Sequence, residues 1–263
     1  MKIKIISGWT NPGGSTTANI NLCNLFNEKG VDCTFYGSHE WHLDKCKSGL
    51  FSDLELEEDD IVIVHFMPVD YKPPVSKLVL SVHEKGIQPL QSYKNLEFFD
   101  FVHFINNEQR KWHSVDYPFE IIPNVYDALV KDTKTEESKE VAGVIGSFDF
   151  NKNTHVSIQR ALDDGYKKVL LYGKIVDEIY YKETIEPMLG DTIINVGFAE
   201  DKQGMYDSID AAYLSSDSEV DPYVRGECVL TGTKFYGNEN TNFGNSPMSK
   251  NKIFKKWKKC LGF

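Results

Sequence analysis

A glycine-rich loop directly after the first apolar run could hold an anionic group. The segment runs Gly8-Trp-Thr-Asn-Pro-Gly-Gly-Ser15. Glycines let a ligand approach the backbone, and free amides at a helix N-terminus favour a phosphate or a carboxylate. Gly14 stands where a P-loop has its lysine, and the glycine spacing of a dinucleotide fingerprint is absent, so neither of those sites is indicated. A phosphate-facing loop and a structural tight turn both stay open.

Two glutamates in the last quarter of the chain could accept hydrogen bonds from hydroxyl groups. Glu219 and Glu227 are separated by seven residues and follow the apolar run AAYLSS at 211–216. If Glu219 ends a loop and Glu227 opens a helix, both carboxylates lie at the carboxyl edge of a sheet. A charged acceptor there suits the hydroxyls of a ribose or a sugar. The alternative is a pair of solvated surface glutamates, which is common in an acidic chain.

The scaffold that positions the glycine loop is predicted to be a parallel sheet. The helix after the loop is predicted from Ala18, Leu22 and Leu25, which share one helical face. Ser15 can cap its N-terminus and Gly30 can end it. Mainly apolar runs are typical of strands that a parallel sheet buries between helices. Such runs occur at 2–6, 31–36, 61–66, 77–83 and 101–105.

The second half of the chain repeats the strand and helix alternation after a polar segment. Strands are predicted at 141–145, 167–173, 192–198 and 211–216, helices at 153–162 and 176–189, and a loop at 237–246. The pattern predicts an α/β protein with two doubly wound parallel-sheet domains facing each other across a cleft, where ligands bind beyond the carboxyl ends of strands. The expected parts are a first domain at 1–127, a linker at 128–140, a second domain at 141–248 and a terminal helix at 249–263.

Composition limits the class of protein. The chain has 263 residues, 41% hydrophobic and 26% charged, which is ordinary for a folded domain. Its formal charge of −10 disfavours a surface that grips a polyanion throughout. An odd number of cysteines without paired spacing predicts a reducing compartment. No run of 18 apolar residues and no signal peptide core is present, so a cytoplasmic protein is expected.

The order of the motifs resembles that of a compact retaining GT-B glycosyltransferase of family 4. The resemblance is colinear over most of the chain and rests on several motifs, each weak alone. They are Gly13-Gly14 before the first helix, His83-Glu84 at a strand end, Pro123-Asn124 closing the first domain, Gly146 with Lys152 opening the second, and Glu219 with Glu227. The resemblance implies a GT-B fold whose C-terminal helix docks back on the first domain. It implies transfer of a hexose or pentose from a nucleotide diphosphate sugar to a hydroxyl acceptor with retention at the anomeric carbon.

The resemblance also implies a role for each matched residue. His83 would contact the transferred sugar, Lys152 would neutralise the diphosphate leaving group, and Glu219 would bind hydroxyls of the donor sugar; these are the expected catalytic residues. Glu227 would hold the ribose, and the Gly13-Gly14 segment would approach the donor phosphates or the acceptor. The expected donor-binding residues are therefore Gly13, Gly14, Lys152, Glu219 and Glu227. Because protein cations stabilise the leaving phosphate, no metal and no cofactor is expected.

Two positions depart from the family pattern. Ser147 stands near the place of a second phosphate-binding cation, which Lys174 or Arg225 could supply instead. Inside the glutamate motif an aromatic-glycine step is replaced by Asp221-Pro222, and proline has no N–H for a sugar hydroxyl. The sequence therefore predicts neither the sugar nor the nucleotide.

Other functions stay open beside the transferase. A nucleotide-sugar epimerase or a phosphorylase has the same two-domain shape, and a non-catalytic nucleotide-sugar binding module would need the same donor site. The acceptor of a transferase is equally open between a glycan, a lipid-linked glycan, a small molecule and a modified base in DNA.

Candidate acceptor residues follow the second predicted strand. Trp41, His42 and Lys45 lie in an aromatic-rich loop of the first domain. The spacing of His39 and His42 could hold a metal, but no third ligand accompanies it, so no metal site is expected. His65 and His103 lie in apolar strands and are expected to be core or strand-end residues.

The C-terminal segment KNKIFKKWKK combines six lysines with three apolar side chains on one helical face. The spacing predicts a helix that docks its apolar face on the first domain and leaves its lysines in solvent. The alternative is contact of the lysines with an anionic membrane or a nucleic-acid acceptor.

Overall fold

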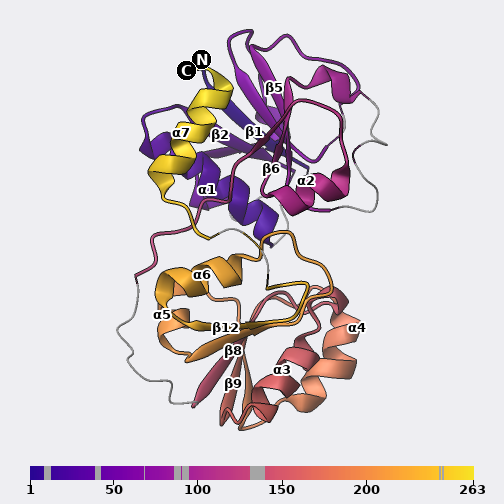
Figure 1. The fold of residues 1–263 in the computed structure, drawn as a ribbon, viewed down its shortest axis with the longest axis vertical. Helices are drawn as coiled ribbons and strands as arrows, with labels where there is room; N and C mark the ends of the chain where they lie inside the picture. Colours follow the sequence, from indigo (N-terminus) through magenta and orange to yellow (C-terminus); the bar gives the residue numbers. More distant parts are fainter. Residues whose placement is uncertain are drawn as a thin grey trace. The chain divides into compact units, whose positions relative to one another are not determined.

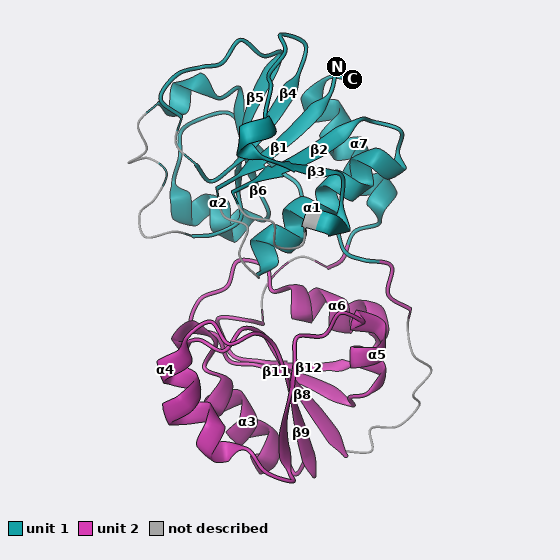
Figure 2. Cartoon of the chain, turned by 180° about the vertical axis from the view of Figure 1, so that it is seen from behind, with its two compact units in different colours: residues 1–127, 248–263 teal, residues 128–247 magenta. Residues whose placement is uncertain are grey.

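The chain forms two compact units in a computed structural model (Figures 1 and 2). One unit comprises Met1–Asp127 with Met248–Phe263, and the other comprises Ala128–Pro247. The end of the chain therefore belongs to the first unit (Figure 2). The structure describes residues 1–8, 13–38, 43–67, 69–85, 90, 95–130, 140–242, 244 and 246–263.

The first unit contains a seven-stranded sheet in the order β3-β2-β1-β4-β5-β6-β7, with every neighbouring pair parallel. Its central strands coincide with the mainly apolar runs that predict them, because a strand covered on both faces buries nearly all of its side chains. The edge strands β3 and β7 are short, only partly buried, and outside the predicted set. The strands are β1 (Ile3–Ser7), β2 (Cys33–Gly37), β3 (Ser48–Leu50), β4 (Ile61–His65), β5 (Lys77–Val82), β6 (Phe101–Phe104) and β7 (Phe119–Ile121).

The α-helices in the described part of the first unit are α1 (Gly14–Glu28), α2 (Asn107–His113) and α7 (Lys250–Leu261). Helix α1 begins two residues earlier than predicted, with Gly13 in place of Ser15 at its N-cap and no side chain capping it. The helix ends as predicted, since Gly30 adopts φ 75°, which glycine reaches without a steric penalty. The predicted docking of the C-terminal helix on the first domain is confirmed by the packing of α7.

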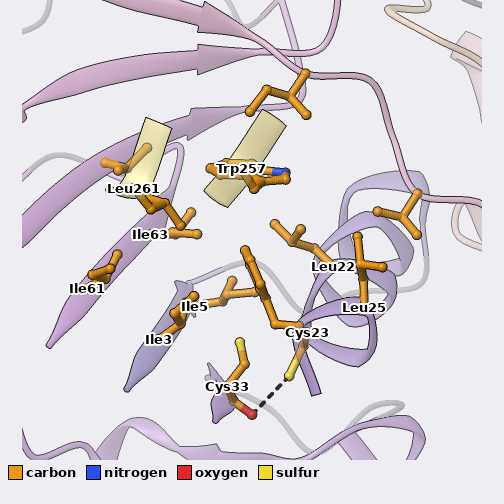
Figure 3. Close-up of a cluster of buried hydrophobic side chains, with 14 of the residues drawn as sticks. Ile3, Ile5, Leu22, Cys23, Leu25, Cys33, Ile61, Ile63, Trp257 and Leu261 are labelled. Atoms are coloured by element: carbon orange, nitrogen blue, oxygen red, sulfur yellow. Dashed lines mark hydrogen bonds between the residues drawn. The ribbon is translucent and has the colours of Figure 1, made fainter. Parts of the chain in front are cut away.

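The core beneath α7 consists of rungs of apolar side chains that run across the strands (Figure 3). Residues alternate in β1 and β4, so Ile3 and Ile5 share a face with Ile61 and Ile63, and register pairs each isoleucine with its neighbour. From the helix side, the Trp257 and Leu261 side chains close this face. Trp257 is 1% exposed and packs edge-to-face on Phe26 of α1 at 6.2 Å between ring centroids. The apolar face of the lysine-rich helix is thus fully used in packing.

The second unit contains a five-stranded parallel sheet in the order β10-β9-β8-β11-β12. Four strands match the predicted runs, while β12 lies just before the loop predicted at 237–246 and was not predicted. The strands are β8 (Val141–Ile145), β9 (Lys168–Tyr172), β10 (Ile193–Gly197), β11 (Ala211–Leu214) and β12 (Lys234–Gly237), and the helices are α3 (Thr154–Asp163), α4 (Glu178–Tyr180), α5 (Lys202–Asp207) and α6 (Tyr223–Thr231).

The helix predicted at 176–189 forms as three short helical pieces. Helix α4 continues into a π-helical turn at Tyr181–Ile185 and a 3-10 turn at Glu186–Met188. Pro187 in the last piece lacks an N–H and cannot extend a regular α-helix. The buried Tyr180 and Ile185 side chains still face the core of this unit, so the predicted amphipathic face is preserved.

The predicted α/β class with two parallel sheets is confirmed. In the part of the chain that the structure describes, no helix combines the length and the apolar character needed to cross a bilayer.

Candidate functional site

Each sheet has one point where the strand order reverses, and polar residues gather at both points. In the first unit the chain leaves β1 toward β2 on one side and returns to β4 on the other; in the second unit β8 and β11 have the same relation. Ligands of open parallel sheets bind beyond the carboxyl ends of strands at such reversals. The candidate site residues are therefore the polar side chains at and directly after the carboxyl ends of these strands.

In the first unit, the last inward-facing rung of the sheet is polar. Register pairs Ser7 with His65, His65 with Ser81, and Ser81 with His103, so the four side chains stand in one row across β1, β4, β5 and β6. The Ser7 Oγ and His65 Nδ1 atoms are 2.8 Å apart, as are Ser81 Oγ and His103 Nδ1. We call Ser7, His65, Ser81 and His103 the polar row. Each of its members is almost completely buried.

His83 and Glu84 lie beside the polar row, directly after β5. The His83 Nε2 atom is 3.0 Å from Ser81 Oγ, and the His83 ring meets the His65 ring edge-to-face at 5.0 Å between centroids. The His65 Nε2 atom donates to Glu84 Oε2 at 3.2 Å. The candidate sugar-contacting histidine therefore belongs to a connected group of side chains from adjacent strands.

Burial controls the charge of these histidines. It lowers the pKa of His83 well below the ordinary value, and the neighbouring rings of His65 and His103 lower it further. Burial also lowers the pKa of His103 to about 4, although a hydrogen bond to the Ile122 carbonyl works in the opposite direction. For Glu84, burial alone would raise the pKa, but the hydrogen bond and charge of His65 together with the Ser15 hydroxyl lower it overall. At neutral pH, His83 and His103 are neutral and Glu84 is a carboxylate.

The Gly13-Gly14 segment lies at the N-terminus of α1. Gly13 is exposed, and a Cβ atom added to it would meet no heavy atom within 4 Å among the described residues. Open space next to the N-terminal amides of a helix suits the approach of an anionic group. Of the acceptor candidates, Lys45 is exposed in a 3-10 turn at Leu43–Lys45, while Trp41 and His42 lie outside the described residues.

In the second unit, the loops after β8 and β11 are hydrogen-bonded to each other. The Asp217 amide donates to the Asn151 carbonyl at 2.8 Å, and Asn153 Nδ2 donates to Asp217 Oδ1 at 2.6 Å. Asn153 adopts the left-handed conformation with φ 47°, which asparagine tolerates better than most residues. These contacts bring the loop that carries Lys152 against the loop that carries Glu219.

Lys152 and Glu219 form an ion pair at this edge of the second sheet. The Lys152 Nζ atom donates to Glu219 Oε1 at 2.5 Å, and the two side chains are 24% and 14% exposed. Gly146 precedes the lysine, and a Cβ atom there would contact the lysine side chain at 3.7 Å. The structure thus brings together two of the residues singled out in the sequence, a cation that suits phosphate and a carboxylate that suits hydroxyls.

Glu227 lies in the middle of α6, so the prediction that it opens this helix is wrong. Pro222 is the N-cap, because its fixed φ favours a helix start, and the first helical residue is Tyr223. Glu227 is 3% exposed, and its carboxylate accepts from Lys202 Nζ at 2.8 Å and from the Tyr206 hydroxyl at 2.7 Å. Both partners come from α5, and neither Lys152 nor Glu219 is among its contacts in the described part of the chain.

Sequence reasoning missed Arg160, which connects the loops of the second unit. Its guanidinium donates to Ser215 Oγ at 3.1 Å and to the Gly237 carbonyl at 3.0 Å. Arginine provides several donors in a rigid plane, which suits bridging two segments. Lys174, a candidate for the second phosphate-binding cation, makes a different kind of contact. Its Nζ atom lies over the Phe198 ring, 5.0 Å from the ring centroid.

One acidic group in the described residues has the spacing of metal ligands. Glu57, Asp59 and Asp60 could each offer one oxygen to a common point. All three already pair with cations, namely Lys2, the N-terminal amine and Lys4. These ion pairs account for the cluster without an ion.

The chain is similar in fold to several solved structures. The crystal structure of Anabaena Alr3699/HepE in complex with UDP and glucose is 15% identical over 100% of this chain and 90% of that chain, with a TM-score of 0.70. TarM is 10% identical over 99% and 91%, with a TM-score of 0.70. WaaG, a glycosyltransferase involved in lipopolysaccharide biosynthesis, is 11% identical over 99% and 90%, with a TM-score of 0.63. No model of a known protein family and no curated protein matches the sequence.

These similarities establish the fold. The two parallel-sheet units of the chain match those of GT-B glycosyltransferase structures, as the order of the sequence motifs predicts. Identities of 10% to 15% are too low to carry an activity or the role of a residue from one protein to another.

Proposed function

We propose that the chain is a glycosyltransferase that moves a sugar from a nucleotide diphosphate sugar to a hydroxyl acceptor, with retention at the anomeric carbon and without a metal. The observation that carries the proposal is the Lys152–Glu219 pair at the reversal point of a GT-B-like second sheet. Retention is proposed because the motif order resembles that of family 4 enzymes. UDP-sugars are the first donors to test, since the HepE crystal structures contain UDP and UDP-glucose.

The chemistry fits the charges of this pair. Breaking the bond between a sugar and a diphosphate leaves negative charge on the phosphate, and a lysine positioned there stabilises the transition state more than the ground state. Glu219 offers acceptor oxygens to sugar hydroxyls. Lys152 and Glu219 neutralise each other in the structure, and a bound donor would replace their ion pair by a lysine–phosphate contact and a carboxylate–hydroxyl contact.

Glu227 is proposed to hold the ribose. A carboxylate has about four lone-pair sites for hydrogen bonds. Lys202 and Tyr206 each donate to one of these sites on Glu227. The remaining sites can accept from ribose hydroxyls, while the two partners hold the carboxylate in place.

Thermal denaturation with a panel of UDP-, GDP- and ADP-sugars tests the donor site. A ligand at one hundred times its dissociation constant stabilises the folded state by about 2.7 kcal/mol. Glu227→Gln should weaken binding of both the nucleotide sugar and the free nucleoside diphosphate. Glu219→Gln should weaken only the nucleotide sugar, and Glu183→Gln serves as the control because Glu183 is an exposed glutamate of the same unit. The proposal fails if no nucleotide sugar shifts the transition.

Turnover without an acceptor separates the proposed transferase from its alternatives. A transferase leaks nucleoside diphosphate and free sugar slowly, whereas an epimerase returns an isomeric nucleotide sugar and a binding module leaves the donor intact. A phosphorylase releases sugar 1-phosphate when inorganic phosphate is supplied.

A further inference from the structure

The hydrogen bonds around His103 fix the position of its proton. His103 Nε2 lies 2.8 Å from the Ile122 carbonyl oxygen, which can only accept, so Nε2 carries the hydrogen. A neutral imidazole has one N–H, and burial keeps this ring neutral at physiological pH. The His103 Nδ1 atom is therefore an acceptor.

The same reasoning assigns donor and acceptor in the hydrogen bonds from His103 through Ser81 to His83. Because His103 Nδ1 accepts, the Ser81 hydroxyl at 2.8 Å must donate to it. The Ser81 oxygen is then free to accept, and His83 Nε2 at 3.0 Å donates. His83 consequently keeps its hydrogen on Nε2 and carries a lone pair on Nδ1. Among the described residues nothing hydrogen-bonds to this buried Nδ1 atom.

His65 offers an internal comparison. Its Nε2 donates to Glu84 and its Nδ1 lies 2.8 Å from the Ser7 hydroxyl, so both ring nitrogens are satisfied within the protein. His83 differs, since its Nε2 is paired with Ser81 while its buried Nδ1 acceptor has no donor among the residues that the structure describes. Buried polar atoms without a partner are rare and often mark a function.

We propose that Ser81 and His103 are positioning residues that hold His83 in its Nε2–H tautomer, so that His83 Nδ1 accepts a hydrogen bond from a hydroxyl group of the transferred sugar. This inference rests on the proposed function. It assigns a polarity to the contact: a sugar hydroxyl donates, and a donor analogue in which that hydroxyl is absent or methylated leaves the Nδ1 lone pair unpaired. A site built to pair with a hydroxyl rejects an analogue lacking it much more strongly than an apolar pocket does.

Helix α7 covers one end of the hydrogen-bonded relay formed by His103, Ser81 and His83. The Trp257 ring lies 4.6 Å from the His103 ring between centroids, on the side of the sheet covered by the C-terminal helix. This packing adds to the burial that lowers the pKa of His103 and keeps its ring neutral, and only a neutral ring has an Nδ1 atom that can accept from Ser81. The docked helix thus contributes to the chemistry of His83 through Trp257 and His103.

The first arm of the test reads the tautomers directly, without any ligand. The ¹⁵N chemical shifts of the imidazole nitrogens are measured in full-length protein labelled at histidine. We expect His83 and His103 both in the Nε2–H form. Ser81→Thr and Ser81→Val have the same shape and differ only in the hydroxyl, so Thr should keep the His83 tautomer and Val should lose it. If neither folds, Ser81→Ala takes the place of Val, with wild type as its reference.

Ser7→Ala is the matched control, because it removes an equivalent strand-end hydroxyl from the neighbouring His65. It should leave the shifts of His83 unchanged. A His83 found in the Nδ1–H form in the wild-type protein overturns the relay, and so does a Val variant whose His83 shifts equal those of the Thr variant.

The second arm asks whether the acceptor serves a sugar. Binding of UDP-glucose and of free UDP is measured for the Thr and Val variants. We expect Val to bind UDP-glucose about tenfold more weakly than Thr, equivalent to ~1.4 kcal/mol, with equal UDP affinity. One of the monodeoxy derivatives of UDP-glucose should abolish the difference. Equal UDP-glucose affinities for the two variants would overturn the sugar contact.

The outcomes also separate this inference from the proposed function. If the wild-type protein binds no nucleotide sugar, the proposed function fails and the sugar contact fails with it, while the tautomer measurement still decides whether Ser81 and His103 position His83.

Discussion

Acidification from pH 7.5 to pH 5 should destabilise the first unit by about 2 kcal/mol through His103 alone. The pKa of His103 is lowered from 6.5 to about 4 in the folded protein, because its ring is buried between the sheet and Trp257. In the unfolded chain the same ring has its ordinary pKa. At a pH between these two pKa values the unfolded state binds a proton at His103 and the folded state does not. The free energy of unfolding therefore falls as the pH falls.

The magnitude follows from the two pKa values. At pH 7.5 neither state is appreciably protonated at this position. At pH 5 the unfolded chain is almost fully protonated, whereas the folded state is protonated in roughly a tenth of molecules, which gives the difference of about 2 kcal/mol. Below the folded pKa of about 4 both states bind the proton and the loss levels off. His83 and His113, whose pKa values are also lowered, add to the total loss of the wild-type protein.

The assay is urea denaturation followed by tryptophan fluorescence. All four tryptophans, Trp9, Trp41, Trp112 and Trp257, belong to the first unit, so the signal reports on that unit alone. The readout is the difference in unfolding free energy between the two pH values, compared between the wild-type protein and His103→Gln. Because the comparison is made within each protein, the constant cost of the substitution cancels.

The variant should lose about 2 kcal/mol less than the wild type on acidification. His155→Gln, in the second unit, is the control and should behave as the wild type in this assay. If His103→Gln shows the same loss as the wild type, His103 is not a buried neutral ring and the directional argument for Ser81 and His83 loses its starting point.

Three further predictions concern packing and loop positioning. Arg160→Met should speed hydrogen exchange at 215–219 and weaken UDP binding about tenfold, because two charge-assisted hydrogen bonds are lost; unchanged exchange would contradict its bridging role. Trp257→Ala should lower the stability of the first unit by about 3 to 5 kcal/mol, measured in urea with the remaining tryptophans, and a change below ~1 kcal/mol would rule out a docked α7. Glutamine at four exposed lysines of α7 should leave stability within ~0.5 kcal/mol and donor turnover unchanged, and lost transfer to an anionic acceptor with normal turnover would show that the lysines bind it. These lysines are Lys252, Lys255, Lys256 and Lys259.

The sequence could predict the central strands because burial on both faces leaves a continuous apolar run, as in Ile61–His65. The edge strands β3 and β7 escape this rule, since one side of each lacks a neighbour and their residues are only partly buried or exposed. Pro222 indicates the start of α6, since proline favours the first turn of a helix, whereas the spacing of Glu219 and Glu227 carries no information about that start.

Individual residues of the candidate site could be predicted from the sequence, but the contacts between their side chains could not. Lys152 and Glu219 were each singled out, yet their contact depends on β8 lying next to β11, which sequence alone does not give. The polar row left a signal in the sequence: serine or histidine stands two positions after the last inward-facing apolar residue of four strands. Only the strand register turns that signal into hydrogen bonds among these side chains.

The most direct measurement of the central claim is the fate of UDP-glucose, and of GDP- and ADP-linked donors in parallel, followed by proton NMR without an acceptor. The account predicts slow release of nucleoside diphosphate from at least one donor together with free sugar that first appears in the anomeric configuration of that donor. Free sugar of the opposite configuration would contradict retention. An isomeric nucleotide sugar, or donors that all remain intact, would contradict glycosyl transfer itself.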